Sequence, residues 1–236
     1  IALSNGANLS VTSSGGAITT TAIQGTSDED VTLNANGTLS VGAIGNGTGV
    51  NDVSLTGATV NLSGNITTSD DATDNGLVTI NGNAFAKTNL LIDTSDGGGV
   101  ITFSNSIDAD GSARSLSLNA GAGNIDFDGA AGGADPFSSL SITNAGNVTF
   151  DSTVATDGAL TQTAGTGTTT FTGAANAASY DVTATTGIVT SSTLTATGGG
   201  NISLASDELS FGGGANSIIG TGTLTLKQAT AAATVG

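Results

Sequence analysis

Residues 140–171 read LSITNAGNVTFDSTVATDGALTQTAGTGTTTF, and this stretch decides the fold. It holds two copies of one pattern: a run that begins at Leu140 or Leu160, an interval rich in turn residues, and a second run that ends in Phe. Within the runs apolar residues alternate with polar ones, the period of a β-strand with one buried face. Two strands per repeat, joined by turns, indicate a coil of β-structure in which each turn stacks on the last.

The Phe that closes the pattern recurs over four consecutive repeats. Phe103, Phe127, Phe150 and Phe171 follow one another at intervals of roughly 20 to 25 residues, within the range of a solenoid coil. Aromatic rings at one place in every turn bury a large apolar area and favour offset contacts. We therefore expect these four rings to stack inside the coil and to hold the register of one turn on the next.

The remaining phenylalanines are assigned by the same spacing. Phe85 and Phe211 are expected to extend the column in both directions, while Phe137, beside the single Pro of the chain, is expected to lie outside it. In the coil after Phe171 the place in the column is expected to pass to Ile188-Val189.

Alternating triplets continue along the whole chain in three interleaved series, and most steps within a series match the interval between the phenylalanines. The first series comprises Leu9-Val11, Val31-Leu33, Val53-Leu55, Val78-Ile80, Leu90-Ile92, Leu116-Leu118, Leu140-Ile142, Leu160, Tyr180-Val182, Ile202-Leu204 and Leu224-Leu226. The second comprises Ile18, Leu39-Val41, Val60-Leu62, Phe85, Ile101-Phe103, Ile125-Phe127, Val148-Phe150, Phe171, Ile188 and Leu209-Phe211. The third comprises Ile23, Ile44, Ile66, Ile107, Val154 and Leu194. The one irregular step, from Val78 to Leu90, is about half the usual interval and indicates a shortened turn or a misassigned strand.

These patterns predict an all-β chain that forms one continuous parallel β-solenoid over residues 1–236. We expect about 10 to 11 coils of roughly 20–25 residues, two to three strands in each coil, and little or no helix. At roughly 4.8 Å per coil the rod would be about 50 Å long. A β-sandwich also alternates strands and turns, but it has no reason to repeat one side-chain type at one phase.

The charge balance excludes some partners. Nineteen acidic residues stand against Lys87, Arg114 and Lys227, a net charge of −16. Binding of nucleic acid or of an anionic membrane begins with Lys and Arg, so we expect neither partner. No apolar run approaches the length of a membrane span, so no membrane insertion is expected. The chain has no Cys, so stability must come from stacked backbone ladders and an apolar core.

Catalysis is not expected, because the chain lacks the usual chemistry. It contains no His, Cys or Trp and only one Tyr and one Arg. Paired carboxylates occur at Asp70-Asp71, Asp108/Asp110, Asp126/Asp128 and Asp207-Glu208. A polysaccharide-degrading site would usually combine such acids with Arg or Lys and with aromatic platforms for sugar, and none of these pairs has a plausible electrostatic partner. The sequence therefore predicts a protein that is not an enzyme.

Calcium is the one cofactor that these acids would suit, and no cofactor is required. Asp108-Ala109-Asp110-Gly111 and Asp126-Phe127-Asp128-Gly129 share an Asp-x-Asp-Gly form that offers carboxylates beside a flexible backbone. Acids placed on turns for solubility would give the same pattern. Melting temperatures with and without a chelator would separate these two interpretations.

Thr-rich stretches raise ice binding as another alternative. Residues 166–170 and 193–197 place Thr at alternate positions, as a flat ice-binding face requires. The Thr pairs vary in phase and miss many coils, and Thr is also a favoured residue on the exposed side of a strand.

Residues 140–150 and 160–174 resemble the β-strand repeats of very large bacterial surface exoproteins, similar in style to filamentous haemagglutinin and other secreted adhesins. The resemblance is strongest over residues 115–211. It implies a right-handed β-helix, export across a Gram-negative envelope, an extracellular or cell-surface location, and a role in adhesion, biofilm matrix or extracellular filaments.

Both ends of the solenoid lack a polar capping segment. Ile1-Ala2-Leu3 opens the chain abruptly, and ten residues follow Thr223-Leu224-Thr225-Leu226. Because an end coil presents unpaired strand edges, we expect head-to-tail stacking as a module or subunit of a bacterial filament or matrix fibre. The alternative is a stalk segment of a large secreted adhesin whose binding tip lies elsewhere, with host or cell-surface glycans as partners.

Overall fold

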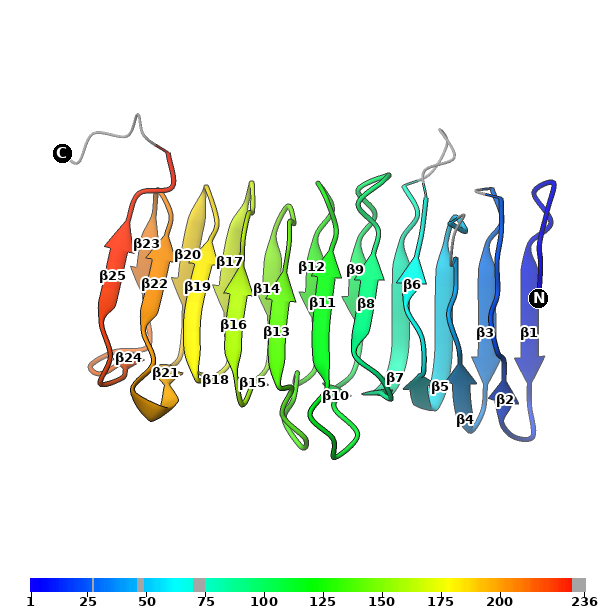
Figure 1. Cartoon of the computed structure of the whole chain (residues 1–236), viewed down its shortest axis with the longest axis horizontal. Helices are drawn as coiled ribbons and strands as arrows, with labels where there is room; N and C mark the ends of the chain where they lie inside the picture. The colour runs from blue at the N-terminus through cyan, green and yellow to red at the C-terminus, as the bar shows by residue number, and fades with distance from the viewer. Residues whose placement is uncertain (27, 46–48, 70–74, 231–236) are drawn as a thin grey trace.

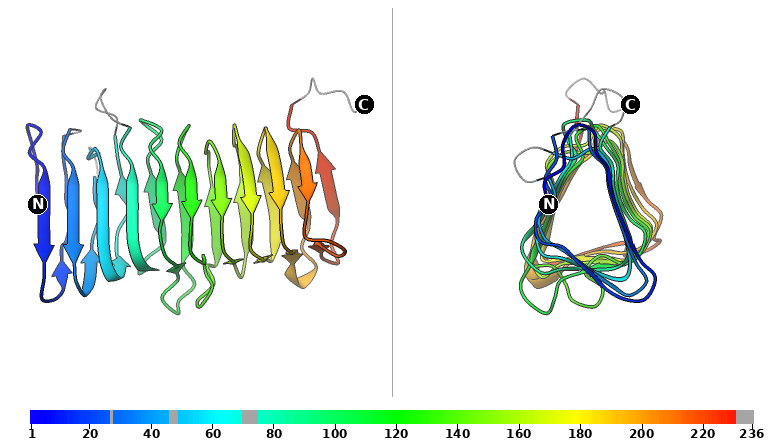
Figure 2. Two further views of the ribbon diagram at one scale, coloured as in Figure 1. Left: turned by 180° about the vertical axis from the view of Figure 1, so that it is seen from behind. Right: turned by 90° about the vertical axis from the view of Figure 1, so that its right-hand side faces the viewer.

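The computed structural model describes residues 1–26, 28–45, 49–69 and 75–230, which form one elongated β-solenoid (Figure 1). Every strand pair in it is parallel, and in end view each coil is a triangle with three faces (Figure 2). Seen from the N-terminal end, the chain turns clockwise as it recedes, so the coil is right-handed (Figure 2, right). The predicted all-β solenoid of about ten coils is confirmed.

The strands of the three faces alternate along the chain. The first face comprises β1 (Leu9–Ser13), β3 (Val31–Ala35), β5 (Val53–Leu62), β7 (Val78–Ala86), β9 (Ile101–Phe103), β12 (Ile125–Phe127), β14 (Val148–Phe150), β17 (Thr168–Phe171), β20 (Gly187–Thr190) and β23 (Leu209–Phe211). The second comprises β2 (Ile18–Thr19), β4 (Thr38–Val41), the second halves of β5 and β7, β10 (Ile107–Asp108), β15 (Val154–Ala155), β18 (Ala175–Ala177), β21 (Leu194–Ala196) and β24 (Ile218–Ile219). The third comprises β6 (Ile66–Thr67), β8 (Leu90–Asp93), β11 (Ser115–Asn119), β13 (Ser139–Ile142), β16 (Ala159–Gln162), β19 (Ser179–Thr183), β22 (Ile202–Ala205) and β25 (Leu224–Lys227). We number the coils 1 to 10 by their strands on the first face.

Helix is nearly absent, as expected. Within the described residues it is limited to the three-residue 3-10 turn η1 (Thr197–Gly199).

The core consists of columns of side chains that point inward from every coil. One column on the third face contains Ile23, Ile44, Ile66, Ile92, Leu118, Ile142, Gln162, Val182, Leu204 and Leu226. The alternating sequence places these residues inside and their Ser, Thr and Asp neighbours outside, which is the reason for the period of two. Parallel ladders join each strand to the coils on either side, so main-chain hydrogen bonds and apolar burial supply the stability together.

The predicted stack of phenylalanines is confirmed. Phe103, Phe127, Phe150 and Phe171 are buried, and successive ring centroids lie 5.0, 4.8 and 5.0 Å apart with interplanar angles of 10°, 12° and 8°. The rings therefore repeat at close to the spacing between strands. Phe137 lies outside the stack, as expected, and is fully buried.

Phe85 was expected to continue the stack, and this expectation is wrong. Ala84 and Ala86 hold the inward positions in the second half of β7, so the ring of Phe85 between them is turned outward and is only partly buried. On the surface the Lys87 ammonium lies 5.3 Å from the ring centroid. In this half of β7 the small alanine side chains therefore point into the core, and the phenylalanine ring points to the surface.

The break in the column after Phe171 is also assigned wrongly by the sequence. Phe171 pairs with Thr190, and Ile188 pairs with Thr169. Thr190 is buried, and its Oγ1 has no hydrogen-bond partner among the described residues. Phe211 then pairs with Thr190, so the column resumes there as predicted.

The irregular step at residues 78–90 arises from a misassigned strand. Val78 belongs to the first face and Leu90 to the third, so the first series changes faces between them, and the second series changes from the second face to the first. The third series also contains two faces, since Ile66 pairs on the third and Ile107 on the second. The number of faces is as expected. Each series of triplets, however, follows a single face only before the step at residues 78–90 or only after it, and changes to another face across it.

Candidate functional site

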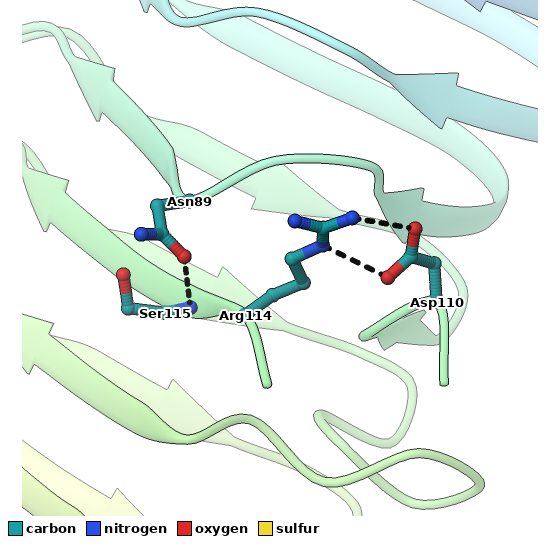
Figure 3. A network of polar contacts seen from close by, with 4 residues as sticks. All are labelled: Asn89, Asp110, Arg114 and Ser115. Carbon is teal, nitrogen blue, oxygen red and sulfur yellow. Dashed lines mark hydrogen bonds and ion pairs between the residues drawn. The ribbon is translucent and has the colours of Figure 1, made fainter. Parts of the chain in front are cut away.

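Two of the four aspartates predicted for calcium are held by neighbouring groups. Asp108 is buried in β10, and its Oδ1 accepts a hydrogen bond from the Ala134 N–H at 2.9 Å. Asp110 receives two hydrogen bonds from the Arg114 guanidinium, at 2.9 and 3.1 Å (Figure 3). These bonds hold the pKa of Asp110 at about 2. The ion pair closes the loop before β11, where Asn89 Oδ1 accepts the Ser115 N–H of the next coil at 3.1 Å.

The other two aspartates lie on the first face. Asp126 is the outward residue of β12, opposite Thr149 of the next coil, and Asp128 follows the strand. Partial burial raises the pKa of Asp126, a hydrogen bond with Thr149 lowers it, and the carboxylates of Asp128 and Asp151 raise it further. The four predicted ligands therefore belong to two different faces, and the structure does not bring them into one group.

The acids show no assembled metal or catalytic centre. In the part of the chain that the structure describes, no three His, Cys, Asp or Glu side chains are grouped closely enough to hold a metal ion. Asp207 accepts hydrogen bonds from the N–H and Oγ1 of Thr230, at 3.0 and 2.8 Å, and so fastens the segment after β25. The pair Asp70-Asp71 lies outside the described residues. Calcium binding stays a prediction.

The raised pKa of Asp126 gives a pH-dependent stability of definite sign. A carboxyl whose pKa is higher in the folded state binds its proton more tightly there, so its contribution favours folding below the unfolded pKa and is lost as pH rises through the folded pKa. We expect Asp126→Asn to increase the free energy of unfolding at pH 7 by less than about 1 kcal/mol. The gain should fade as the pH is lowered through the range in which Asp126 titrates.

A matched control separates this local effect from the net charge. Asp181 is exposed on β19 between Thr161 and Ser203, so Asp181→Asn removes the same charge from a position without an opposing acid. Urea unfolding of both variants from pH 4 to pH 8 makes the comparison. Equal pH profiles for the two variants would contradict the assignment to Asp126.

The last coil leaves part of the core uncovered. Leu224 and Leu226 of β25 are inward residues, yet 48% and 46% of their surfaces are exposed, whereas their partners Ile202 and Leu204 are 3% and 0% exposed. The difference arises because no coil of the described chain stacks on β25. At the opposite end Leu9 and Val11 of β1 are also only partly buried.

A groove follows the corner between the first and second faces over coils 1 to 5. This corner shortens coil by coil: seven residues from Val11 to Ile18, six from Leu33 to Leu39, five from Leu55 to Val60, and four from Ile80 to Ala84 and from Phe103 to Ile107. The first coils therefore project beyond the later ones, as the blue corner in Figure 2 (right) shows. The resulting recess has a volume of about 760 Å³.

The floor of the groove is a single register column of alternating Thr and Asn. Thr12 pairs with Asn34, Asn34 with Thr56, and Thr56 with Asn81. The remaining lining comes from corner residues, including Ala58, Asn83 and Asn105, and contains no charged side chain. This groove was not predicted from the sequence. The number of residues between the strands of the first and second faces does fall along the sequence, but this trend can be recognised only after each strand has been assigned to its face.

Comparison with protein-family models, with curated proteins and with solved structures finds no match. Among the described residues, no helix has both the length and the apolar character needed to cross a membrane. The surfaces described above are therefore the basis for any functional assignment.

Proposed function

We propose that this chain is a structural, non-catalytic module of an extracellular bacterial filament or matrix fibre, and that its solenoid stacks head to tail. The observation that carries the proposal is the uncovered core at β25. Completing the burial of Leu224 and Leu226 would stabilise an end-to-end contact by about 1.5–3 kcal/mol. The strand edges of an end coil add main-chain groups that another parallel strand can pair with.

The shapes of the two end coils support this contact. The corner between the first and second faces spans seven residues in coil 1, from Val11 to Ile18, and seven in coil 10, from Phe211 to Ile218. Coils of equal corner length can stack there without leaving a step.

The corner between the second and third faces differs in length between the two end coils, but the difference is no larger than one found between neighbouring coils inside the rod. It spans five residues in coil 1, from Ile18 to Ile23, and eight in coil 10, from Ile218 to Leu226. The same corner spans eleven residues in coil 6, from Ala131 to Ile142, and eight in coil 7, from Val154 to Gln162. These two coils stack although their corners differ by the same three residues. Because a contact between unlike ends does not close on itself, repeated stacking gives a filament.

Consecutive solenoid modules of a longer polypeptide would use the same end surfaces. In that version the rod is the stalk of a secreted adhesin. Both versions require β25 to be covered by another coil, and both suit the expected extracellular location.

The test is self-association of the purified chain, followed by sedimentation velocity and electron microscopy over increasing concentration. We expect rods that lengthen in steps of about 48 Å, ten coils at roughly 4.8 Å each. Leu224→Asp/Leu226→Asp should abolish the lengthening, because carboxylates would be buried in the contact. Thr225→Asp is the matched control, since Thr225 points outward from the same strand. A chain that stays monomeric at high concentration, or equal assembly by both variants, would overturn the proposal.

A further inference from the structure

We propose that the groove along the corner of coils 1 to 5 binds an uncharged oligosaccharide. The groove lies on the side of the rod, so this proposal stands on different residues from those that carry end-to-end stacking. The groove is a shallow, open recess of about 760 Å³, which suits a ligand that lies along the surface of the rod.

Three of the five Asn side chains that line the groove are available to a ligand. The other two are bonded to the protein: Asn36 Nδ2 donates to the Ser14 carbonyl oxygen at 3.3 Å, and Asn83 Oδ1 accepts from Ser106 Oγ at 3.5 Å. Asn34, Asn81 and Asn105 make no side-chain hydrogen bond within the described part of the chain, and Asn34 and Asn81 are exposed on one column of the floor. Elsewhere Asn side chains support the fold: Asn147 Nδ2 donates to Asn124 Oδ1 at 3.2 Å, and Asn147 Oδ1 accepts the Thr168 N–H at 2.9 Å. Three lining amides that make no bond to a neighbouring coil favour a role in recognition over one in structural support.

The chemistry of the lining selects hydroxyl groups. A carboxamide offers two donors and an acceptor, and a Thr hydroxyl offers both functions, so each can pair with a sugar hydroxyl that itself donates and accepts. Thr and Asn alternate in register from Thr12 to Asn81, one residue per coil at roughly 4.8 Å. A periodic floor of this kind suits a polymer of repeating hydroxyl-bearing units.

Charge excludes anionic ligands. No Lys or Arg lines the groove, and the chain carries a net charge of −16, so phosphates and uronic or sialic acids would be repelled. An extended peptide is disfavoured along most of the groove as well, because β3, β5 and β7 beneath it lie inside a sheet and their main-chain groups are already paired. Without an aromatic platform, hydrogen bonds must carry the affinity, and water competes for them, so binding will be weak enough to require millimolar ligand.

The test titrates soluble neutral and acidic oligosaccharides, each up to millimolar concentration, into ¹⁵N-labelled chain. We expect backbone amide shifts to gather at the residues of the groove. Asn34→Ala/Asn81→Ala should weaken binding at least tenfold, which corresponds to the loss of one to two hydrogen bonds. Asn176→Ala is the control, because Asn176 is an exposed outward residue of β18 on the second face, away from the groove.

The outcomes are decisive in both directions. Groove-centred shifts with a neutral glycan that the double variant loses and Asn176→Ala keeps would support the proposal. Shifts with acidic oligosaccharides alone, shifts with none at millimolar concentration, or undiminished binding by the double variant would overturn it. Circular dichroism verifies that each variant keeps its strands, as expected for exposed positions.

Discussion

Replacing Phe127 by Ala is expected to destabilise the solenoid by about 3–5 kcal/mol, the usual cost of emptying the site of a buried aromatic ring. Phe127 lies in the middle of the stack, 5.0 Å from the ring of Phe103 and 4.8 Å from that of Phe150. The substitution removes both stacking contacts, each worth about 0.5–1.5 kcal/mol beyond simple burial. It also leaves a void between two coils that cannot move together without breaking their backbone ladders.

Two other phenylalanines provide the controls. Phe137→Ala empties a fully buried site that takes no part in the stack, so it should cost less than Phe127→Ala by the stacking contribution. Phe85→Ala removes an outward ring that contacts Lys87 and should cost about 1 kcal/mol or less. Urea unfolding followed by circular dichroism measures all three, with the slope compared as well as the midpoint, because repeat arrays can lose two-state behaviour. If Phe127→Ala cost no more than Phe85→Ala, the stack would not be a source of stability.

Gly82→Ala is expected to be comparably damaging, by about 2–6 kcal/mol, for a reason that concerns the backbone. Gly82 has φ +135°, a conformation that L-residues rarely adopt, at the place where β7 turns the corner under the groove. An added Cβ would lie 1.8 Å from the Gly57 carbonyl oxygen of the coil before, in a β5–β7 ladder that already shifts register there. Strain and clash therefore combine, and the two strands must separate locally.

Gly111→Ala isolates the strain from the clash. Gly111 has φ +77° but no atom within 4 Å of an added Cβ, so this variant should cost only the backbone strain, about 1–3 kcal/mol. The difference between the two variants in urea unfolding gives the cost of forcing β5 and β7 apart. An equal loss for both would show that the close approach at the corner does not matter.

The fold was predictable because its determinants repeat. The Phe stack, the burial of alternate residues and the near absence of helix all follow from local patterns that recur once per coil, and the structure confirms each of them. Faces were assigned less well, because a triplet such as Val78-Ile80 looks the same on any face of the coil. The inward or outward direction of Phe85 depended on the neighbouring alanines, which hold the inward positions of the same strand.

The candidate surfaces were predictable only in part. The bare ends follow from the apolar residues in the first and last described coils, and exposure of Leu224 and Leu226 agrees with that expectation. The pairing of Asp110 with Arg114 was missed, although the two residues are four apart, because a loop of unknown shape lies between them. The groove was missed because it depends on the lengths of five corners taken together.

By itself the sequence determined that the chain is a repeat of short strands coiled around an apolar core, and that four phenylalanines one coil apart stack within that core. This follows because alternation and turn residues act within a few positions of the chain. Only the tertiary structure decided which face each strand joins, where the corner narrows, and which core residues remain uncovered. Those features arise from contacts between residues one coil apart, where small differences in corner length add up along the rod and no local pattern records their sum.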